Sequence, residues 1–408
     1  MVRAALAVAG MVGLAAAGYW ALRLGYADWL ARKGEAWAVE RAVALDAGNA
    51  SYRARLGAVE GQLGEDPGKV IPALEAAVAL NPAYASGWVE LGLRREARGE
   101  LAQAERCLLE AARMDRTFEP AWALANYHFR RGEAGKFWAW ARRAAEMAYG
   151  DVRPLYRLCW RMTPDAGTIL ERAVPNRAAN LAQYLGFLLA DNHLEGAEQA
   201  AKRLAETGDR EQAGLVLSCC DRLLERGQAE AAVRTWNRLA ERGLIRAGRL
   251  APERGESLAN ATFREDSLGH GFDWRMPGLA GVTITRGERE SAVRVAFSGE
   301  QPEDCECLWQ WAPVMPGRRY RLRFQYRTVQ VGRPSGLRWR VLEAGSGAEL
   351  APGSPDLAAE NWTSGAVDFE TRDQTRLIRL SLGYRRASGT TRIEGALWVR
   401  DLRLELER

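Results

Sequence analysis

Residues 85–118 read ASGWVELGLRREARGELAQAERCLLEAARMDRTF, and this stretch decides the fold of the first half of the chain. Apolar and small residues recur in it at helical spacing on both sides of a break at Gly99. Trp122 follows Trp88 at an interval of 34 residues, and Ala125 follows Leu91 at the same interval. A fixed period of this length predicts an array of helical hairpins, each packed on the next.

The residues that carry the repeat are large, medium and small in a set order: Trp88, Leu91, Gly92, Gly99, Ala104, Leu108 and Ala111. Their spacing resembles that of the bacterial tetratricopeptide repeat (TPR) family, in which such residues meet where two antiparallel helices touch. Asn81-Pro82 ends an earlier unit, because proline cannot continue a helix. We expect an α-solenoid, with TPR repeats over residues 27–150 and degenerate TPR-like hairpins over 151–250, where prolines interrupt the register.

The resemblance implies a concave surface that holds an extended peptide or a helix of a protein partner. By their position in the unit, the residues expected to face this groove are Val89, Leu93, Glu96, Ala123, Tyr127, Arg130 and Arg131. For Arg130 and Arg131 a solvated helix end is the alternative interpretation.

The N-terminus carries a targeting signal. Arg3 is followed by an uncharged run from Ala4 to Leu22, long enough to cross ~30 Å of hydrocarbon as a helix. Residues 1–26 are therefore predicted to be a transmembrane signal anchor, although Ala15–Ala17 would also suit cleavage as a signal peptide. Tyr19-Trp20, an aromatic pair suited to the membrane interface, favours retention. We expect a single-pass anchored protein with its bulk on the extracytoplasmic or periplasmic side.

The second half of the chain changes to strand periodicity. Tyr320, Leu322, Phe324 and Tyr326 alternate with polar residues, which predicts a strand with one wet face. Several such runs, separated by glycine and proline, predict an antiparallel β-sandwich or jelly roll over residues 256–408. The predicted fold class is therefore multidomain, α then β.

The order of landmarks in this half resembles that of galactose-binding-like jelly rolls found as carbohydrate-binding modules. The landmarks are Asn260–Phe263, Val314–Tyr320, Trp362–Phe369 and Trp398–Leu404. Members of that family often hold a structural calcium with an acid directly after the opening Phe and an Asp in the last strand. Asp401 stands at the second position, but Arg264 occupies the first, so the calcium pattern is incomplete. No other cofactor or metal is expected.

Sugar recognition needs aromatic faces and planar hydrogen-bonding groups. The candidate glycan-binding residues are Trp309, Trp311, Gln325, Arg338 and Arg385. Because sandwich cores also use tryptophan, a buried position for Trp309 and Trp311 is the alternative. Trp362 and Trp398 are interpreted as core residues.

Little in the sequence points to catalysis or to nucleic acid. The net charge of +5 comes from 57 basic and 52 acidic residues, with no basic block that would follow a phosphate backbone. Only three histidines are present, none in a metal-binding or nucleophile motif, and there is no phosphate-binding loop. The six cysteines form no CxxC pair. We expect a protein that is not an enzyme.

These observations lead to one main hypothesis and two alternatives. The main hypothesis is a membrane-anchored extracytoplasmic scaffold that binds a protein through the TPR groove and an envelope glycan through the β-sandwich, in polysaccharide assembly or export. In the first alternative the sandwich is structural or protein-binding, for example as a cap on the helical array. In the second, the chain is an unrecognised glycan-active hydrolase that uses a pair of carboxylates.

Overall fold

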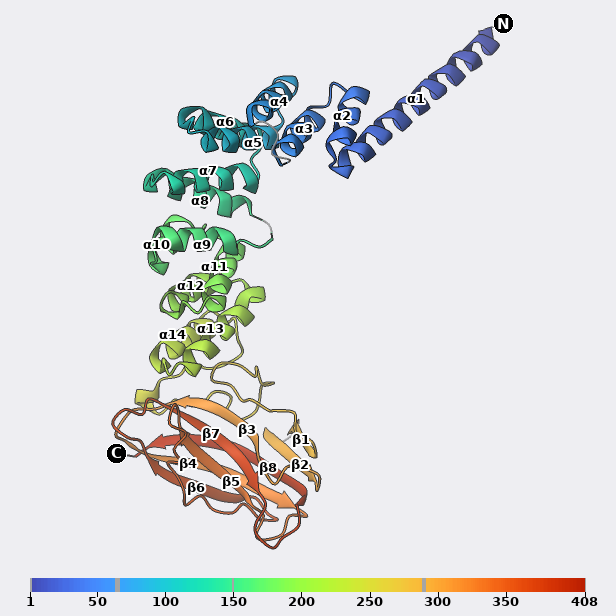
Figure 1. The fold of residues 1–408 in the computed structure, drawn as a ribbon. Coiled ribbons are helices and arrows are strands. Elements are labelled where there is room, and N and C mark those ends of the chain that lie inside the picture. Colours follow the sequence, from blue (N-terminus) through green and yellow to red (C-terminus); the bar gives the residue numbers. More distant parts are fainter. Residues whose placement is uncertain (1, 63–66, 149, 288–290, 408) are drawn as a thin grey trace. The chain divides into compact units, whose positions relative to one another are not determined.

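The structure is a computed structural model that describes residues 2–62, 67–148, 150–287 and 291–407. In this part of the chain, α-helices precede β-strands (Figure 1). The helices are α1 (Val2–Lys33), α2 (Ala36–Leu45), α3 (Ala50–Gln62), α4 (Pro67–Leu80), α5 (Ala85–Ala97), α6 (Leu101–Met114), α7 (Phe118–Arg130), α8 (Ala134–Met147), α9 (Arg153–Met162), α10 (Ala166–Arg172), α11 (Ala178–Ala190), α12 (Leu194–Glu206), α13 (Ala213–Glu225) and α14 (Ala229–Glu241). The strands are β1 (Val282–Gly287), β2 (Ala292–Ser298), β3 (Asp304–Pro313), β4 (Arg319–Val329), β5 (Leu337–Glu343), β6 (Thr363–Glu370), β7 (Leu377–Arg385) and β8 (Glu394–Leu406). The predicted order of a helical region followed by antiparallel sheets is confirmed.

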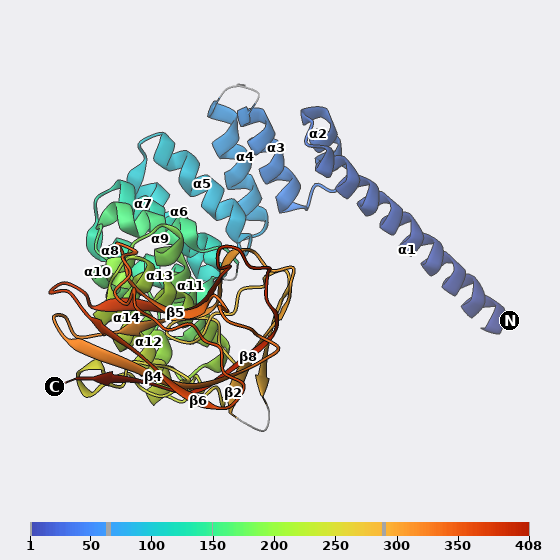
Figure 2. The ribbon, with the colours of Figure 1, turned by 90° about the horizontal axis from the view of Figure 1, so that it is seen from below.

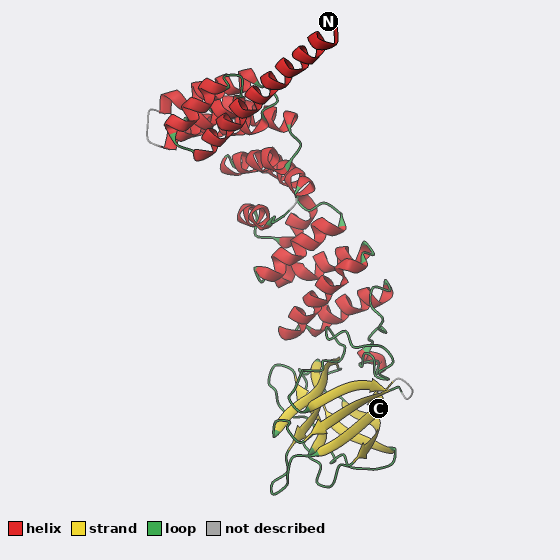
Figure 3. Cartoon of the chain, turned by 90° about the vertical axis from the view of Figure 1, so that its right-hand side faces the viewer, coloured by secondary structure: helices red, strands yellow, loops and turns green. Residues whose placement is uncertain are grey.

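The chain divides into two compact units, residues 1–175 and 176–408, which are described separately. This division falls inside the segment predicted to hold degenerate hairpins. The first unit contains α1 to α10, and the second contains α11 to α14 together with all described strands (Figure 3).

Helix α1 is the apolar element of the first unit. Its portion Val8–Lys33 spans 26 residues and is long and apolar enough to cross a membrane, a test that a signal sequence also passes. Leu14 and Leu22 are 76% and 78% exposed, so the described residues of the first unit leave most of these side chains uncovered. The N-terminal part of α1 extends away from the other helices of its unit in Figures 1 and 2. Such an exposed apolar surface is typical of a membrane span or of a signal sequence.

The C-terminal part of α1 is the first helix of the folded unit. Ala27, Leu30 and Ala31 are buried in a cluster with Ala38 and Ala42 of α2. The helix is continuous through residue 26, where the predicted anchor ends. The apolar segment and the first helix of the folded unit are therefore parts of one continuous helix.

Helices α3 to α8 form successive contacting pairs, α3 with α4, α5 with α6 and α7 with α8. A methyl group on Gly92 of α5 would lie 2.8 Å from the Leu108 side chain and 3.2 Å from the Ala104 carbonyl oxygen of α6. Only glycine permits this approach of the two helices. Gly99, with φ +80°, makes the turn between them, a conformation that favours glycine.

The register weakens where the sequence predicts it. Helix α10 is only seven residues long and follows Pro164, while Pro175 follows it closely. The pairing of helices then resumes in the second unit, with α11 against α12 and α13 against α14.

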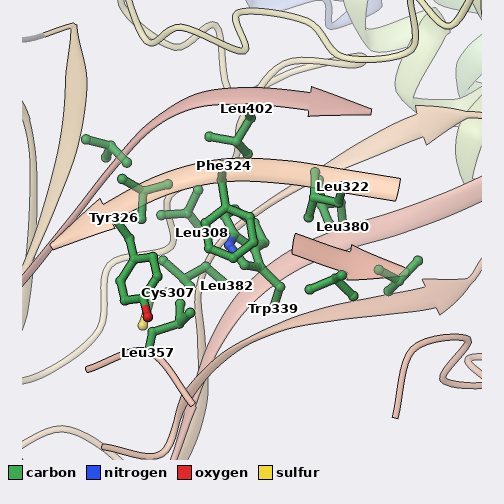
Figure 4. Close-up of a cluster of buried hydrophobic side chains, with 14 of the residues drawn as sticks. Cys307, Leu308, Leu322, Phe324, Tyr326, Trp339, Leu357, Leu380, Leu382 and Leu402 are labelled. Atoms are coloured by element: carbon green, nitrogen blue, oxygen red, sulfur yellow. The ribbon is translucent and has the colours of Figure 1, made fainter. Parts of the chain in front are cut away.

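The strands form two antiparallel sheets, five-stranded in the order β1-β2-β8-β4-β6 and three-stranded in the order β3-β7-β5. One hydrophobic cluster draws side chains from both sheets, among them Phe324 of β4 and Trp339 of β5, whose rings lie 5.8 Å apart (Figure 4). The alternation predicted in β4 is confirmed, since Tyr320, Leu322, Phe324 and Tyr326 are all buried. Each sheet therefore has one inner face and one outer face. We call this part the two-sheet domain.

Inside the second unit, the last helical pair is bonded to the segment that precedes β1. Asp221 of α13 accepts hydrogen bonds from Gly271 N at 2.7 Å and from Arg275 Nη2 at 2.5 Å. Trp236 of α14 is fully buried, and its ring packs edge-on against Phe272 at 5.9 Å. These contacts tie the helices to the two-sheet domain.

Candidate functional site

The residues predicted to line a peptide groove divide into two groups. Leu93 and Arg131 are exposed, and the Arg130 side chain is paired with Glu96 at 2.5 Å. Val89, Ala123 and Tyr127 are buried, with exposures of 6%, 7% and 2%.

The prediction that these three buried side chains face an open groove is therefore wrong. The Tyr127 hydroxyl donates to the Leu101 carbonyl oxygen at 3.0 Å, so its polar end is used inside the helical pack. Val89 and Ala123 lie in one core cluster with Leu108 and Leu124, where neighbouring hairpins meet. The position of a residue within the repeat did not predict whether its side chain faces the groove or packs between neighbouring hairpins.

Three acidic or imidazole groups meet beside Tyr127. Glu105, His128 and Glu133 offer ligand atoms within 4.8 Å of one another, a set that could hold a metal ion. The Lys136 ammonium lies 2.8 Å from Glu105 and 3.2 Å from Glu133, so a cation of the protein already contacts both carboxylates. Hydrogen bonding from Lys136 holds the pKa of Glu133 below its usual value. This arrangement fits a structural ion-pair network.

Trp309 and Trp311 lie on the outer face of the three-stranded sheet and are partly exposed. Their rings meet edge-on at 5.5 Å. The guanidinium of Arg379 lies 3.9 Å above the Trp309 ring, and that of Arg275 lies 4.6 Å from it. Arg275 also pairs with Trp309 through both backbone hydrogen bonds. Trp309 is thus neither a free platform nor a core residue, but a ring enclosed by arginines.

The other predicted glycan residues are not gathered around this pair. Arg338 and Arg385 are on the same sheet, where Arg385 Nη2 is 2.6 Å from Asp304. Although burial opposes it, hydrogen bonds from Arg340 and Arg385 keep the pKa of Asp304 below its usual value. Gln325 belongs to β4 of the five-stranded sheet. The five candidate glycan-binding residues are therefore divided between the two sheets.

The outer face of the five-stranded sheet holds a second aromatic cluster, which sequence reasoning missed. Trp398 of β8 lies between Arg294 of β2 and Arg327 of β4, and all three are in register across the sheet. The guanidiniums lie 5.3 Å and 4.8 Å from the Trp398 ring. Both distances fall within the range of cation–π attraction, ≈ 6 Å.

The cluster continues to Trp362, which directly precedes β6. Arg327 lies 5.2 Å and Arg400 lies 4.0 Å from the Trp362 ring. Arg400 Nε donates to Gln325 Oε1 at 2.9 Å. Guanidiniums and indoles thus alternate across strands β2, β8 and β4. Together with Gln325, which bonds to Arg400, we call these residues the Arg–Trp ladder: Arg294, Gln325, Arg327, Trp362, Trp398 and Arg400.

The interpretation of Trp362 and Trp398 as core residues is wrong, since both are partly exposed. A sequence signal was available for Trp398. Leu397 and Val399, the residues on either side of Trp398, are apolar and fully buried. Because side chains alternate along a strand, Trp398 had to lie on the opposite, outer face.

Three carboxylates of the two-sheet domain that could serve the alternative hydrolase are engaged by arginines. Glu306 is paired with Arg379, and Asp368 lies 2.5 Å from Arg321. Glu303 lies 3.3 Å from Arg386. For Asp368, the hydrogen bond from Arg321 holds the pKa of the carboxyl below its usual value.

The two residues of the incomplete calcium pattern, Asp401 and Arg264, each contact an arginine of this chain. Asp401 is exposed, and its carboxylate lies 3.7 Å from Arg400. Arg264 accepts a hydrogen bond from Arg286 through its backbone carbonyl. Arg400 therefore contacts the first of these positions, and Arg286 contacts the second.

No family model matches this chain, and no curated protein matches it. Partial likenesses to solved structures were found. A CBM4 structure shares 15% identity over 37% of this chain and all of that chain, with a TM-score of 0.30. YrrB, a TPR protein with an unusual peptide-binding site, shares 12% identity over 51% of this chain and 93% of its own, with a TM-score of 0.26. MamA shares 21% identity over 28% of this chain and 66% of its own, with a TM-score of 0.25.

Proposed function

We propose that this protein is a non-catalytic, membrane-anchored extracytoplasmic scaffold. Its TPR-like helical array would hold a protein partner, and its jelly-roll-like two-sheet domain would hold a glycan of the cell envelope. A chain of this kind would keep a polysaccharide-assembly or export machine near its product.

The Arg–Trp ladder is the observation that supports glycan binding. Two indoles, three guanidiniums and one amide stand together on a sheet face, and this is the set of groups that reads hydroxyls and ring faces of a sugar. The ladder is therefore proposed as a glycan-binding surface in addition to the predicted pair Trp309 and Trp311. Membrane attachment is supported by the exposed apolar surface of α1.

A structural role of the two-sheet domain is the second candidate function. It is favoured by the contacts of Asp221 and Trp236 with residues 270–275, which cover part of the last helical pair. Repeat arrays need such a covered end. This role leaves the ladder free, because the ladder lies on the other sheet from Trp309 and Arg275.

Partner binding by the helical array is tested with its exposed groove residues. The change of Leu93 to Asp combined with Arg131→Glu is expected to abolish recovery of the partner from solubilised membranes. Both side chains are exposed, so the thermal melting temperature should stay within a few degrees of the wild type.

The control is Arg116→Glu, which repeats the charge change of Arg131→Glu at an exposed position between α6 and α7. It should leave recovery intact. Equal recovery of the same proteins by wild type and by the double variant would exclude the groove as the binding surface. Mass spectrometry of the captured proteins provides the comparison.

A further inference from the structure

Two cysteines of β3, Cys305 and Cys307, lie on the same side of their strand. Cys307 is fully buried in the hydrophobic cluster to which both sheets contribute (Figure 4), and Cys305 is partly buried and packs against that cluster. Glu306, the residue between them, pairs instead with Arg379 on the outer face of the sheet. The two thiols are therefore neighbours on the inner side of β3.

The strand is irregular at this point. The register of β3 against β7 shifts between Glu306 and Leu308, so Cys307 is an extra residue without a partner on β7. In a regular strand, alternate residues lie about 6.6 Å apart, which is at the upper end of the Cα separations found across disulfides, ≈ 6.8 Å. A β-bulge bends the strand, and in one common form a residue of the bulge approaches the more compact helical conformation. The bulge is therefore expected to bring Cys305 and Cys307 into the range in which a disulfide can close.

The two thiols also interact with each other. A hydrogen bond from the Cys307 thiol lowers the pKa of Cys305 below its usual value, although burial opposes this change. The same hydrogen bond raises the pKa of Cys307, and burial adds to this effect. Because the thiolate is the nucleophile, Cys305 is the sulfur of the pair that is prepared to attack a disulfide.

Cys305 also differs from the remaining cysteines of the chain. Burial raises the pKa of the four others outside β3, which are Cys107, Cys159, Cys219 and Cys220. All six cysteines lie in the described part of the chain, and Cys305 is the one that is partly exposed. It also lies on an edge strand, since β7 is the only described strand that pairs with residues 304–307. Cys305 is thus the cysteine that an approaching molecule can reach.

We propose that Cys305 and Cys307 are a reversible redox pair, which closes to an intrastrand disulfide by exchange with a disulfide of a protein or a small molecule. The Cys305 thiolate attacks one sulfur of that disulfide, forms a mixed disulfide and releases the other sulfur as a thiol. The Cys307 sulfur then loses its proton, attacks Cys305 Sγ and displaces the second thiol. Two electrons and two protons thus pass from the cysteine pair to the partner disulfide, which becomes two thiols.

The exchange runs in both directions, because an added thiol opens the closed disulfide through the same mixed disulfide. The pair therefore follows the balance of thiols and disulfides in its surroundings. The modification falls on β3, the strand that carries Trp309 and Trp311. It goes beyond the proposed scaffold function and does not depend on glycan binding.

The test equilibrates the detergent-solubilised full chain with mixtures of reduced and oxidised glutathione, and then traps free thiols with a maleimide in denaturant. Trypsin cuts after Arg294 and Arg318, so the peptide of residues 295–318 contains both cysteines of the pair and no other. Mass spectrometry is expected to show that this peptide loses both trapped thiols as the share of oxidised glutathione rises, with the loss of two hydrogens and no bound glutathione. Cys219 and Cys220 are adjacent in sequence but buried, and as the internal control they should keep their thiols.

Two variants separate the roles of the two sulfurs. Cys307→Ser should stop at the mixed disulfide of Cys305 with glutathione and accumulate about tenfold more of it than the wild type. In the native protein, Cys305→Ser should slow the reaction of peptide 295–318 with a maleimide about tenfold, because the remaining thiol is buried. Cys307→Ala repeats the first experiment without a hydroxyl in the core, and thermal melting establishes that each variant keeps its fold.

Three results would overturn the inference. The first is that both thiols stay free across the whole series, up to oxidised glutathione alone. The second is a wild type in which Cys305 and Cys307 each carry a glutathione, because the pair then does not close. The third is oxidation of Cys219 and Cys220 at the same glutathione ratio, which would mean that exposure and the bulge give the pair on β3 no advantage.

Discussion

Trp236→Ala is expected to lower the free energy of unfolding of the second unit by about 3–5 kcal/mol, the usual cost of emptying a buried tryptophan site. The ring is fully buried, and its Nε1 donates to the Gly248 carbonyl oxygen at 3.1 Å. Gly271 approaches so closely that a methyl group there would lie 2.6 Å from the ring. The site therefore cannot collapse onto a smaller side chain without moving the segment before β1.

Chemical denaturation of the full chain, followed by near-ultraviolet circular dichroism, measures this effect. Trp236→Phe keeps much of the ring volume and should cost less than Trp236→Ala. Trp362→Ala removes a partly exposed ring and is the comparison for a surface position. A loss below about 1 kcal/mol for Trp236→Ala would mean that the last helical pair does not depend on its contact with residues 248–272.

Asp221→Ala is the second large effect, with an expected loss of about 3 kcal/mol. Its carboxylate receives hydrogen bonds from His270 Nδ1 at 2.6 Å, from Gly271 N and from Arg275 Nη2. The Arg275 side chain is only 17% exposed, and burial lowers the pKa of its guanidinium below the ordinary value. Removal of Asp221 leaves a largely buried charge without its carboxylate, and this is the main cost.

The same denaturation experiment distinguishes the cost of leaving the Arg275 charge unpaired from the cost of the cavity that the Asp221 side chain would leave. Asp221→Ala combined with Arg275→Met should recover part of the loss, because it removes the unpaired charge. Arg222→Ala changes the adjacent residue, whose side chain is 45% exposed, and should have little effect. If the double variant is as unstable as the sum of the two single variants, the pair is not coupled and the explanation is wrong.

Helices and strands were predictable because their signals are local. The spacing of Trp88, Gly92 and Leu108 determines where α5 and α6 touch, and Gly92 lies in close contact with Leu108. The alternation from Tyr320 to Tyr326 determines the inner face of β4. Such periodicities follow from 3.6 residues per helical turn and two per strand repeat.

The sites were less predictable because they depend on partners far away in sequence. The sequence around Trp309 predicts an exposed aromatic platform on β3. In the structure its ring is enclosed by Arg275 and Arg379, which lie 34 and 70 residues away in the sequence. Tyr127 occupies a groove position in the repeat, yet the Leu101 carbonyl oxygen draws its hydroxyl inward. A single-sequence pattern contains neither of these pairings.

The ladder required the order of the strands. Arg294, Arg327 and Trp398 lie on three strands that follow one another in space as β2, β8 and β4. Their cross-strand register places the indole between the two guanidiniums. The alternation of Leu397, Trp398 and Val399 could have placed Trp398 on the outer face, but not beside these arginines.

We propose that this protein binds a glycan through the outer face of its five-stranded sheet. The most direct measurement is affinity electrophoresis of the detergent-solubilised full chain through gels that contain envelope polysaccharides, beside the variant Trp362→Ala/Trp398→Ala. We expect at least one polysaccharide to retard the wild type, and we expect the variant to keep its fold but to bind that polysaccharide at least tenfold more weakly. Retardation that is identical for wild type and variant, or absent for both across the panel, would contradict it.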